Sequence, residues 1–181
     1  MTASARYAIP RALAILAGSI VGFILLQHPA RVIESHAVAG LLSLAGAHGT
    51  HVVLGTNIDV EPAEHGLVLA SLTPACSSIA ALLAITSIAL ASGAATRSRR
   101  FAALGIALAV IAVGNILRMA AVLAVGIFAG RSVLVMFHDW VAGMFTFASV
   151  LGGYVLFLYL VLPDRRRAAA AAGGAAADAP A

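Results

Sequence analysis

The chain has 181 residues, of which 62% are hydrophobic and 10% are charged. Soluble proteins have roughly 45–50% apolar and 25% charged residues, so this composition excludes an ordinary soluble globular protein. The formal net charge of +4 comes from 11 basic residues, all arginine, against seven acidic ones. Because most of the arginines stand in short clusters beside apolar segments, the charge indicates membrane topology and not nucleic-acid binding.

Four segments have the length and composition of transmembrane helices, which need about 20 mostly apolar residues. They are residues 7–26, 74–92, 101–130 and 141–162. Residues 32–47 are also apolar, but polar side chains such as Glu34 interrupt them, which favours an interfacial or re-entrant helix over a fifth span. We therefore predict an all-α integral membrane protein, a bundle of about four transmembrane helices.

The arginine clusters at the N-terminus, after the second segment and after the fourth fall on one side of this bundle. By the positive-inside rule that side is cytoplasmic. This predicts a multi-pass protein of the cell membrane, with both termini in the cytoplasm, an uncleaved first span, and residues 27–73 and 131–140 outside. Residues 1–167 would form one transmembrane domain, followed by a disordered Ala/Gly-rich tail over residues 168–181.

The first outer loop combines turn-forming and β-branched residues with possible metal ligands. Residues 51–60 and 66–72 predict extended segments, with a turn near Glu61 and Pro62. The possible ligands are His48, His51, Glu61, Glu64 and His65. His48 and His51 could face one metal ion, but the loop contains no tetrahedral set with reliable spacing. A metal-binding or transport protein is therefore an alternative function.

Cys76 is the single cysteine, and the predicted topology places it at the outer end of the second span. The simplest interpretation of a lone membrane cysteine is a small apolar filler. Thr73 and Pro74 favour a second interpretation, a reactive cysteine, because they predict a helix start that puts Cys76 in the first turn. There the positive end of the helix dipole favours the thiolate, provided that the surroundings are polar or wet.

Arg118 interrupts an apolar run, where an arginine costs about 2.5–3.5 kcal/mol at mid-membrane. Counted from Phe101, it lies about 26 Å along a helix, near the outer boundary and level with Cys76. Snorkelling to the headgroups is the simpler interpretation. Asn115, three positions earlier, shares its helix face, which indicates a polar patch that faces a protein interior.

His138 stands at the outer start of the last span, where an interfacial ring needs no function. Its depth nevertheless matches that of Cys76 and Arg118, so three spans bring one reactive group each to one level. A thiolate attacks carbonyl carbons, an imidazole takes and returns protons, and a guanidinium holds an oxyanion. These groups together predict acyl transfer. Asp139 is assigned no catalytic role, because neighbouring helix positions point apart.

Three motifs follow one another along the chain: Ala75-Cys76-Ser77-Ser78, Asn115-Ile116-Leu117-Arg118, and His138 with Gly143 five residues later. Over residues 66–147 they resemble the exosortase/archaeosortase family of membrane cysteine transpeptidase-like enzymes. The resemblance implies that Cys76 is the nucleophile. It likewise implies that Arg118 stabilises the thiolate or the tetrahedral intermediate and that His138 is the general acid/base.

The implied substrate is a secreted protein whose C-terminal sorting signal consists of a short motif, a transmembrane helix and a basic cytoplasmic end. A thioester on Cys76 would release the signal helix, and water or an amine would resolve it. Asn115, Ser77 and Ser78 are the supporting residues, and we expect no cofactor or metal. Ser78 stands where the family often has glycine, and the chain lacks the extra helices of larger members, so it resembles a compact variant.

A purely structural membrane subunit is the other non-enzymatic alternative. Small-residue contacts, such as Gly105 with Ala109, would then serve helix packing. This alternative leaves Arg118 without a role.

Overall fold

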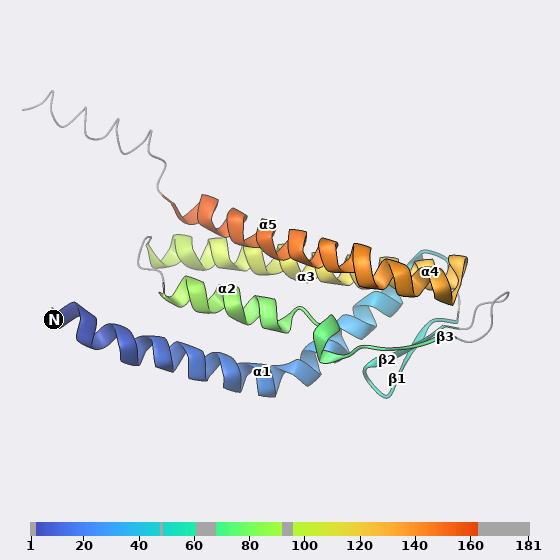
Figure 1. The fold of residues 1–181 in the computed structure, drawn as a ribbon, viewed down its shortest axis with the longest axis horizontal. Helices are drawn as coiled ribbons and strands as arrows, with labels where there is room; N and C mark the ends of the chain where they lie inside the picture. Colours follow the sequence, from blue (N-terminus) through green and yellow to red (C-terminus); the bar gives the residue numbers. More distant parts are fainter. Residues whose placement is uncertain (1–2, 48, 61–67, 92–95, 163–181) are drawn as a thin grey trace, which may run out of the picture.

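The computed structural model describes residues 3–47, 49–60, 68–91 and 96–162. Its elements in chain order are α1 (Ala3–Leu44), β1 (His51–Val53), β2 (Asn57–Val60), β3 (Val68–Ser71), the 3₁₀-helix η1 (Pro74–Cys76), α2 (Ile79–Ala91), α3 (Arg97–Ala129), α4 (Arg131–Met136), the π-helix η2 (Phe137–Ala142) and α5 (Gly143–Val161). The helices run along one common direction, and the sheet lies at the end of the molecule opposite the N-terminus (Figure 1). We call the end that carries the sheet the sheet end. The opposite end carries Arg11 and Arg99, and we call it the arginine end.

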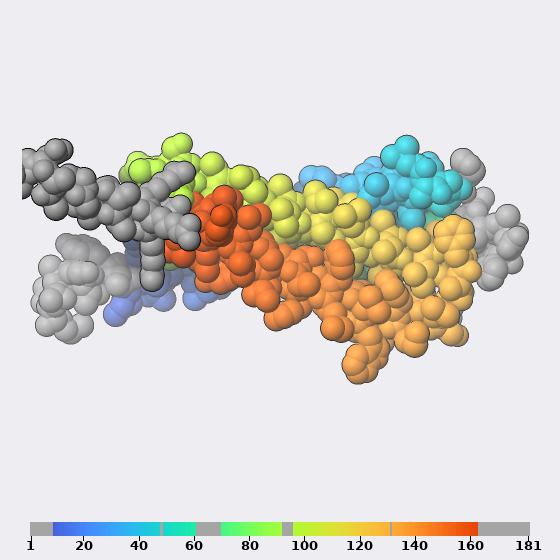
Figure 2. Space-filling view, turned by 90° about the horizontal axis from the view of Figure 1, so that it is seen from above, coloured from blue at the N-terminus to red at the C-terminus, as the bar shows by residue number. Residues whose placement is uncertain are grey.

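Three helical stretches are long and apolar enough to cross a membrane: Ile9–Leu44, Arg97–Ala129 and Ser132–Val161. The mostly helical architecture is therefore confirmed, and the three long apolar helices are compatible with a membrane protein. Figure 2 shows α5 forming much of one face of the molecule. The exposed large apolar side chains of this helix include Met144, Phe147 and Tyr159. An exposed apolar surface of this kind is what a lipid-facing helix presents.

The second predicted span, residues 74–92, does not form one long helix in its described part. Within its described part the chain first forms η1 and then α2, which has 13 residues. That length is below the ~20 residues that a full crossing needs. The count of four spans stays a prediction.

Helix α1 differs from its prediction. One 42-residue helix runs through the predicted break after residue 26 and includes most of the segment 32–47, which was expected to form a separate helix. Pro29 lies inside it, and the helix changes direction near its middle (Figure 1). Because proline removes one helical hydrogen bond and crowds the preceding turn, it bends a helix without having to end it. The bend directs the second half of α1 to the sheet end.

The three strands form an antiparallel sheet in the order β1-β2-β3, in which Ile58 pairs with Val52 on one side and Ala70 on the other. The extended segments predicted in the first loop are thus confirmed. Residues 51–60 form two strands instead of one, because Leu54 and Gly55 adopt positive φ angles of 53° and 76° and turn the chain. The turn predicted near residues 61 and 62 lies outside the described residues, as does the tail 168–181.

The first hydrophobic core lies between the second half of α1, the sheet and the end of α3. Its buried members are Val38, Ala39, Leu42, Ile58, Val60, Leu72, Met119 and Leu123. Burial of these side chains holds the chain leading into η1 against α3. The core therefore sets the position of Cys76, which packs against it.

The predicted outer connection, residues 131–140, is helical. Gly130 turns the chain with a φ of 82°, and α4, η2 and α5 then follow one another without a break. No proline or glycine stands between Gly130 and Gly143, and most residues of the segment are apolar, so nothing ends the helix there. His138 therefore lies within this long helical stretch.

The second hydrophobic core joins α2, α3 and α5. Its buried members are Ile85, Ala89, Ala103, Leu104, Ala107, Ile111, Phe157 and Val161. At Gly153 a Cβ would meet Ile111 Cγ1 at 2.6 Å, so this glycine allows α5 to approach α3. Gly105, which the sequence suggested as a packing residue, has no atom within 4 Å of its Cβ position and faces outward. Close contacts between α3 and α5 are therefore at Gly153 and at Gly114, where a Cβ would meet Ser149 Oγ at 2.9 Å.

Candidate functional site

Cys76 lies in the short turn η1 and not in the first turn of a long helix. Thr73 is extended, Pro74 takes the first helical position, and the N–H of Cys76 donates to the carbonyl of Thr73 at 3.0 Å. Ser77 is extended again, with φ −81° and ψ 144°, so α2 begins only at Ile79. The predicted helix start is correct in its residues, but the extended Ser77 separates Cys76 from the dipole of α2.

The N-terminus of α2 is bound by a carboxylate of the protein itself. Glu34 Oε1 accepts hydrogen bonds from the backbone N–H of Ser78 at 2.9 Å and from its hydroxyl at 2.6 Å. Both residues are buried, with 6% and 7% of their surface exposed. A carboxylate at this position compensates the positive end of α2 and satisfies one of its unpaired N–H groups. The N–H of Ser78 is thus occupied and does not face a substrate.

Asn115 and Arg118 reach Cys76 from α3, through its backbone carbonyl. Arg118 Nη2 donates to Cys76 O at 2.9 Å, and Asn115 Nδ2 donates to the same oxygen at 3.0 Å. Arg118 also donates to Asn115 Oδ1 at 3.1 Å. Both are buried, so the polar face predicted from their spacing points into the bundle and Arg118 does not snorkel to the headgroups.

Asn115 also links this contact to Glu34, because its Nδ2 donates to Glu34 Oε1 at 3.1 Å. A buried cluster therefore joins three helices; we call Glu34, Ser78, Asn115 and Arg118 the polar cluster. Its one formal negative and one formal positive charge are connected through Asn115, and Glu34 Oε2 has no hydrogen-bond partner among the described residues. Glu34 is a residue whose role sequence analysis missed. The available signal was a carboxylate in an otherwise apolar stretch.

The sulfur of Cys76 points toward a different neighbour. Its Sγ lies 3.4 Å from the hydroxyl oxygen of Thr73, and the half-buried side chain packs against the first hydrophobic core. The guanidinium of Arg118 thus holds the carbonyl of Cys76 and not its sulfur. The structure brings Cys76, Ser78, Asn115 and Arg118 together through the backbone of η1.

A small recess of about 40 Å³ lies beside the polar cluster. Ser77, Ser78 and Arg118 line it on one side, and Thr146 and Ser149 of α5 line it on another. Arg118 Nε is buried and has no hydrogen-bond partner among the described residues. A recess of this size, with apolar side chains such as Ile111 and Phe145 also lining it, admits a water molecule or one small group. The recess offers such a group the guanidinium of Arg118, because the hydroxyls of Ser78, Thr146 and Ser149 already donate to other acceptors.

His138 lies in η2 and is not joined to Cys76 or Arg118. Its Nδ1 lies 3.3 Å from Asp139 Oδ1, and this is the one hydrogen bond of its side chain among the described residues. Both side chains are exposed. Sequence analysis expected these adjacent side chains to point apart, whereas on the exposed π-helical turn they make contact. π-helical turns are often found at functional sites.

The possible metal ligands of the first loop are only partly described. His51 Nε2 lies 3.7 Å from Asp59 Oδ2, its cross-strand partner in β1 and β2. The described residues contain no group of three or more His, Cys, Asp or Glu side chains that could hold a metal ion. His48, Glu61, Glu64 and His65 lie outside them.

The chain matches no protein-family model, no curated protein and no solved structure. The similarity to the exosortase/archaeosortase family therefore stays a prediction from the ordered motifs around Cys76, Arg118 and His138.

Proposed function

We propose that the protein is a membrane-embedded cysteine protease or transpeptidase of the exosortase/archaeosortase type. It cleaves the C-terminal sorting signal of secreted proteins at the outer face of the cell membrane, through a thioester on Cys76. The observation that carries this proposal is the buried contact of Arg118 and Asn115 with Cys76 O. An apolar bundle buries an arginine only at a cost, and here the arginine holds the turn that carries the single cysteine.

The contacts around η1 support a defined position for the nucleophile. Two donors on the carbonyl of Cys76 hold the turn against α3, and the sulfur remains half-buried and accessible. Such preorganisation lowers the entropic cost of bringing a nucleophile to a bound carbonyl. Arg118 lines the recess beside the turn, and its buried Nε has no hydrogen-bond partner among the described residues, so this N–H would polarise the substrate carbonyl.

In the proposed reaction the thiolate of Cys76 attacks the scissile carbonyl carbon. The C–N bond breaks, and the leaving amine of the signal helix takes a proton from His138, which has first accepted the thiol proton. Water or an acceptor amine then attacks the thioester and restores the thiol. This step requires the exposed imidazole of His138, which contacts Asp139 in the free protein, to come within hydrogen-bond reach of the reacting atoms in the substrate complex.

The arrangement of α2 supports the proposed orientation in the membrane. Cys76 and the polar cluster lie beside its first turn, whereas Arg11 donates to the carbonyl of Leu90 near its last residue. Arg99 likewise donates to Leu160 O at the end of α5. Arg11 and Arg99 thus lie at the arginine end, whereas Arg31 contacts Leu72 near the sheet end. In the proposed orientation the arginine end is cytoplasmic by the positive-inside rule, and Cys76 faces outward.

A trapping experiment tests the proposal. The full chain is expressed with sorting-signal proteins of the same genome, and an acyl adduct on Cys76 that hydroxylamine removes is sought by mass spectrometry. We expect the adduct and the cleaved substrate in the unmodified protein and in the control His51→Ala, and neither in Cys76→Ser. Normal processing by Cys76→Ser, without any adduct, would reject covalent catalysis. Loss of processing in His51→Ala alone would favour the metal-binding alternative.

A further inference from the structure

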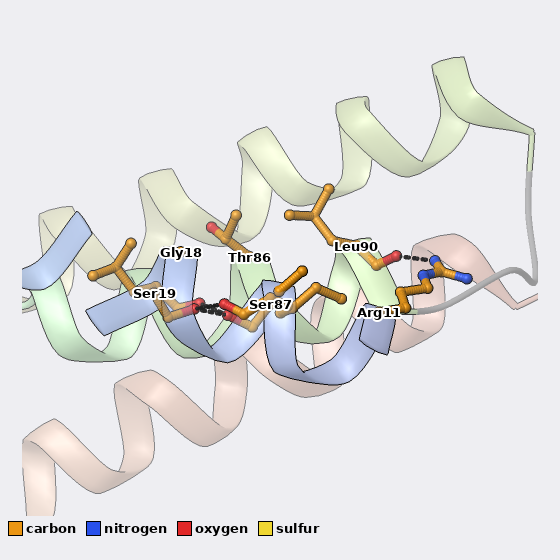
Figure 3. Close-up of a pocket in the computed structure, with 9 residues that line it drawn as sticks. Arg11, Gly18, Ser19, Thr86, Ser87 and Leu90 are labelled. Atoms are coloured by element: carbon orange, nitrogen blue, oxygen red, sulfur yellow. Dashed lines mark hydrogen bonds between the residues drawn. The ribbon is translucent and has the colours of Figure 1, made fainter. Parts of the chain in front are cut away.

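A groove between α1 and α2 lies near the arginine end, away from Cys76. Its volume is about 540 Å³, within the range of small-molecule sites. Arg11 lies at one end of it, beside Leu90, and Ser19 of α1 faces Ser87 of α2 farther along (Figure 3). Gly18 leaves open space in the groove, because no atom lies within 4 Å of its Cβ position.

The walls of the groove present an apolar surface, although they contain hydroxyl groups. Ser19 donates to Ile15 O at 2.8 Å, and Ser87 donates to Leu83 O at 2.7 Å. The two serine hydroxyls also lie 2.6 Å from each other. Thr86 lines the groove as well and donates to its own helix. Since these hydroxyls are already paired, the walls favour a hydrocarbon occupant over a polar one.

Arg11 gives one end of the groove a positive charge. Its Nη2 donates to the carbonyl of Leu90, and the side chain is exposed. A guanidinium has five N–H donors in a planar fork, so the groups on Nε and Nη1 remain for an anion, with no acceptor among the described residues. Phosphate is the anion that this fork matches in the headgroup layer of a membrane.

The length of the groove distinguishes between possible occupants. Arg11 and Ser19 are eight positions apart on α1, which corresponds to about 12 Å. The hydrocarbon core of a bilayer is about 30 Å thick, so the groove extends over about one leaflet. A transmembrane helix would need a contact surface along the whole core. An acyl chain that hangs from a headgroup at Arg11 fits the observed length.

We infer that this groove binds an anionic phospholipid of the leaflet at the arginine end. Its phosphate contacts Arg11, and one acyl chain lies along Gly18, Ser19 and Ser87. The site is independent of the proposed reaction at Cys76, because it lies at the other end of α2 and shares no residue with the polar cluster.

Native mass spectrometry of the full chain, released from nanodiscs of equal parts phosphatidylglycerol and phosphatidylcholine, tests this inference. We expect one retained lipid, with phosphatidylglycerol preferred about fivefold, the effect of one arginine at an anionic surface. Arg11→Gln, which still offers an N–H to Leu90, removes the preference. Arg97→Gln, which removes an equal charge at the same end, keeps it.

A second pair of variants tests the groove itself. Gly18→Leu fills it, whereas Gly105→Leu adds the same side chain to an open position on α3, and neither new Cβ meets an atom within 4 Å. We expect loss of the retained lipid in Gly18→Leu only. Three results would overturn the inference. They are retention of phosphatidylglycerol by Gly18→Leu, equal retention of both lipids by the unmodified chain, and a lipid-free dimer in place of the chain with one bound lipid.

Discussion

Glu34 accepts two hydrogen bonds from Ser78, a residue 44 positions away, one from its backbone N–H and one from its hydroxyl. The pair joins the middle of α1 to the start of α2. Asn115 then connects Glu34 to the carbonyl of Cys76. The position of η1, which carries Cys76, therefore depends on a carboxylate in α1.

Replacement of Glu34 tests the stability of this connection. Glu34→Ala leaves the two donors of Ser78 and one of Asn115 without their acceptor in a buried place, so we expect unfolding to become easier by about 2–4 kcal/mol. Glu34→Gln keeps an oxygen acceptor and should cost less than half as much. The measurement is the unfolding free energy in mixed micelles. Equal values for the two variants would contradict the assigned hydrogen bonds.

Arg118→Lys keeps the positive charge but not the planar fork that reaches Cys76 O and Asn115 Oδ1 together. In the proposed reaction we expect adduct formation on Cys76 to slow by at least about 100-fold, the effect of losing one well-placed donor. The rate is followed by mass spectrometry under single-turnover conditions. Arg97→Lys is the control on the same helix and should retain the normal rate.

Cys76→Ala separates a catalytic cysteine from a packing one. The sulfur is half-buried and its polar contact is the 3.4 Å approach to Thr73, so we expect the unfolding free energy to change by less than about 1 kcal/mol. Substrate processing should be abolished. If Cys76→Ala is strongly destabilised and its folded fraction still processes substrate, Cys76 is a packing residue.

His138→Ala removes an exposed side chain, and we expect a stability change within about 0.5 kcal/mol. Loss of the proton-transfer group should slow adduct formation by about 100-fold or more. Asp139→Asn keeps an oxygen beside the imidazole and should have a much smaller effect. Normal kinetics of His138→Ala would remove His138 from the mechanism.

Gly153→Ala places a Cβ at 2.6 Å from Ile111 Cγ1, so α5 and α3 must separate or repack. We expect a loss of about 1–3 kcal/mol in unfolding free energy. The neighbouring Gly152→Ala meets no atom within 4 Å and is the matched control, with little change expected. Equal melting temperatures of the two variants would argue against the close helix contact.

Features that depend on neighbours along the chain were predictable from the amino-acid order. Apolar composition and length predict membrane helices, and the three-residue spacing of Asn115 and Arg118 puts them on one face, which the structure turns inward. The extended character of residues 51–60 follows from their β-branched residues and turn formers. Each of these features is set by local periodicity or propensity, which a linear pattern records.

Other features depend on which distant atoms meet, and they became visible only in three dimensions. The partners of Glu34 lie 44 and 81 positions away, so nothing in its own segment indicated that it would bind Ser78 and Asn115. Pro29 bends α1 instead of ending it, and the extended Ser77 separates Cys76 from α2. Tertiary packing overrides weak local preferences at such positions, because burial of the helix faces and pairing of buried polar groups contribute more free energy than a single residue's propensity.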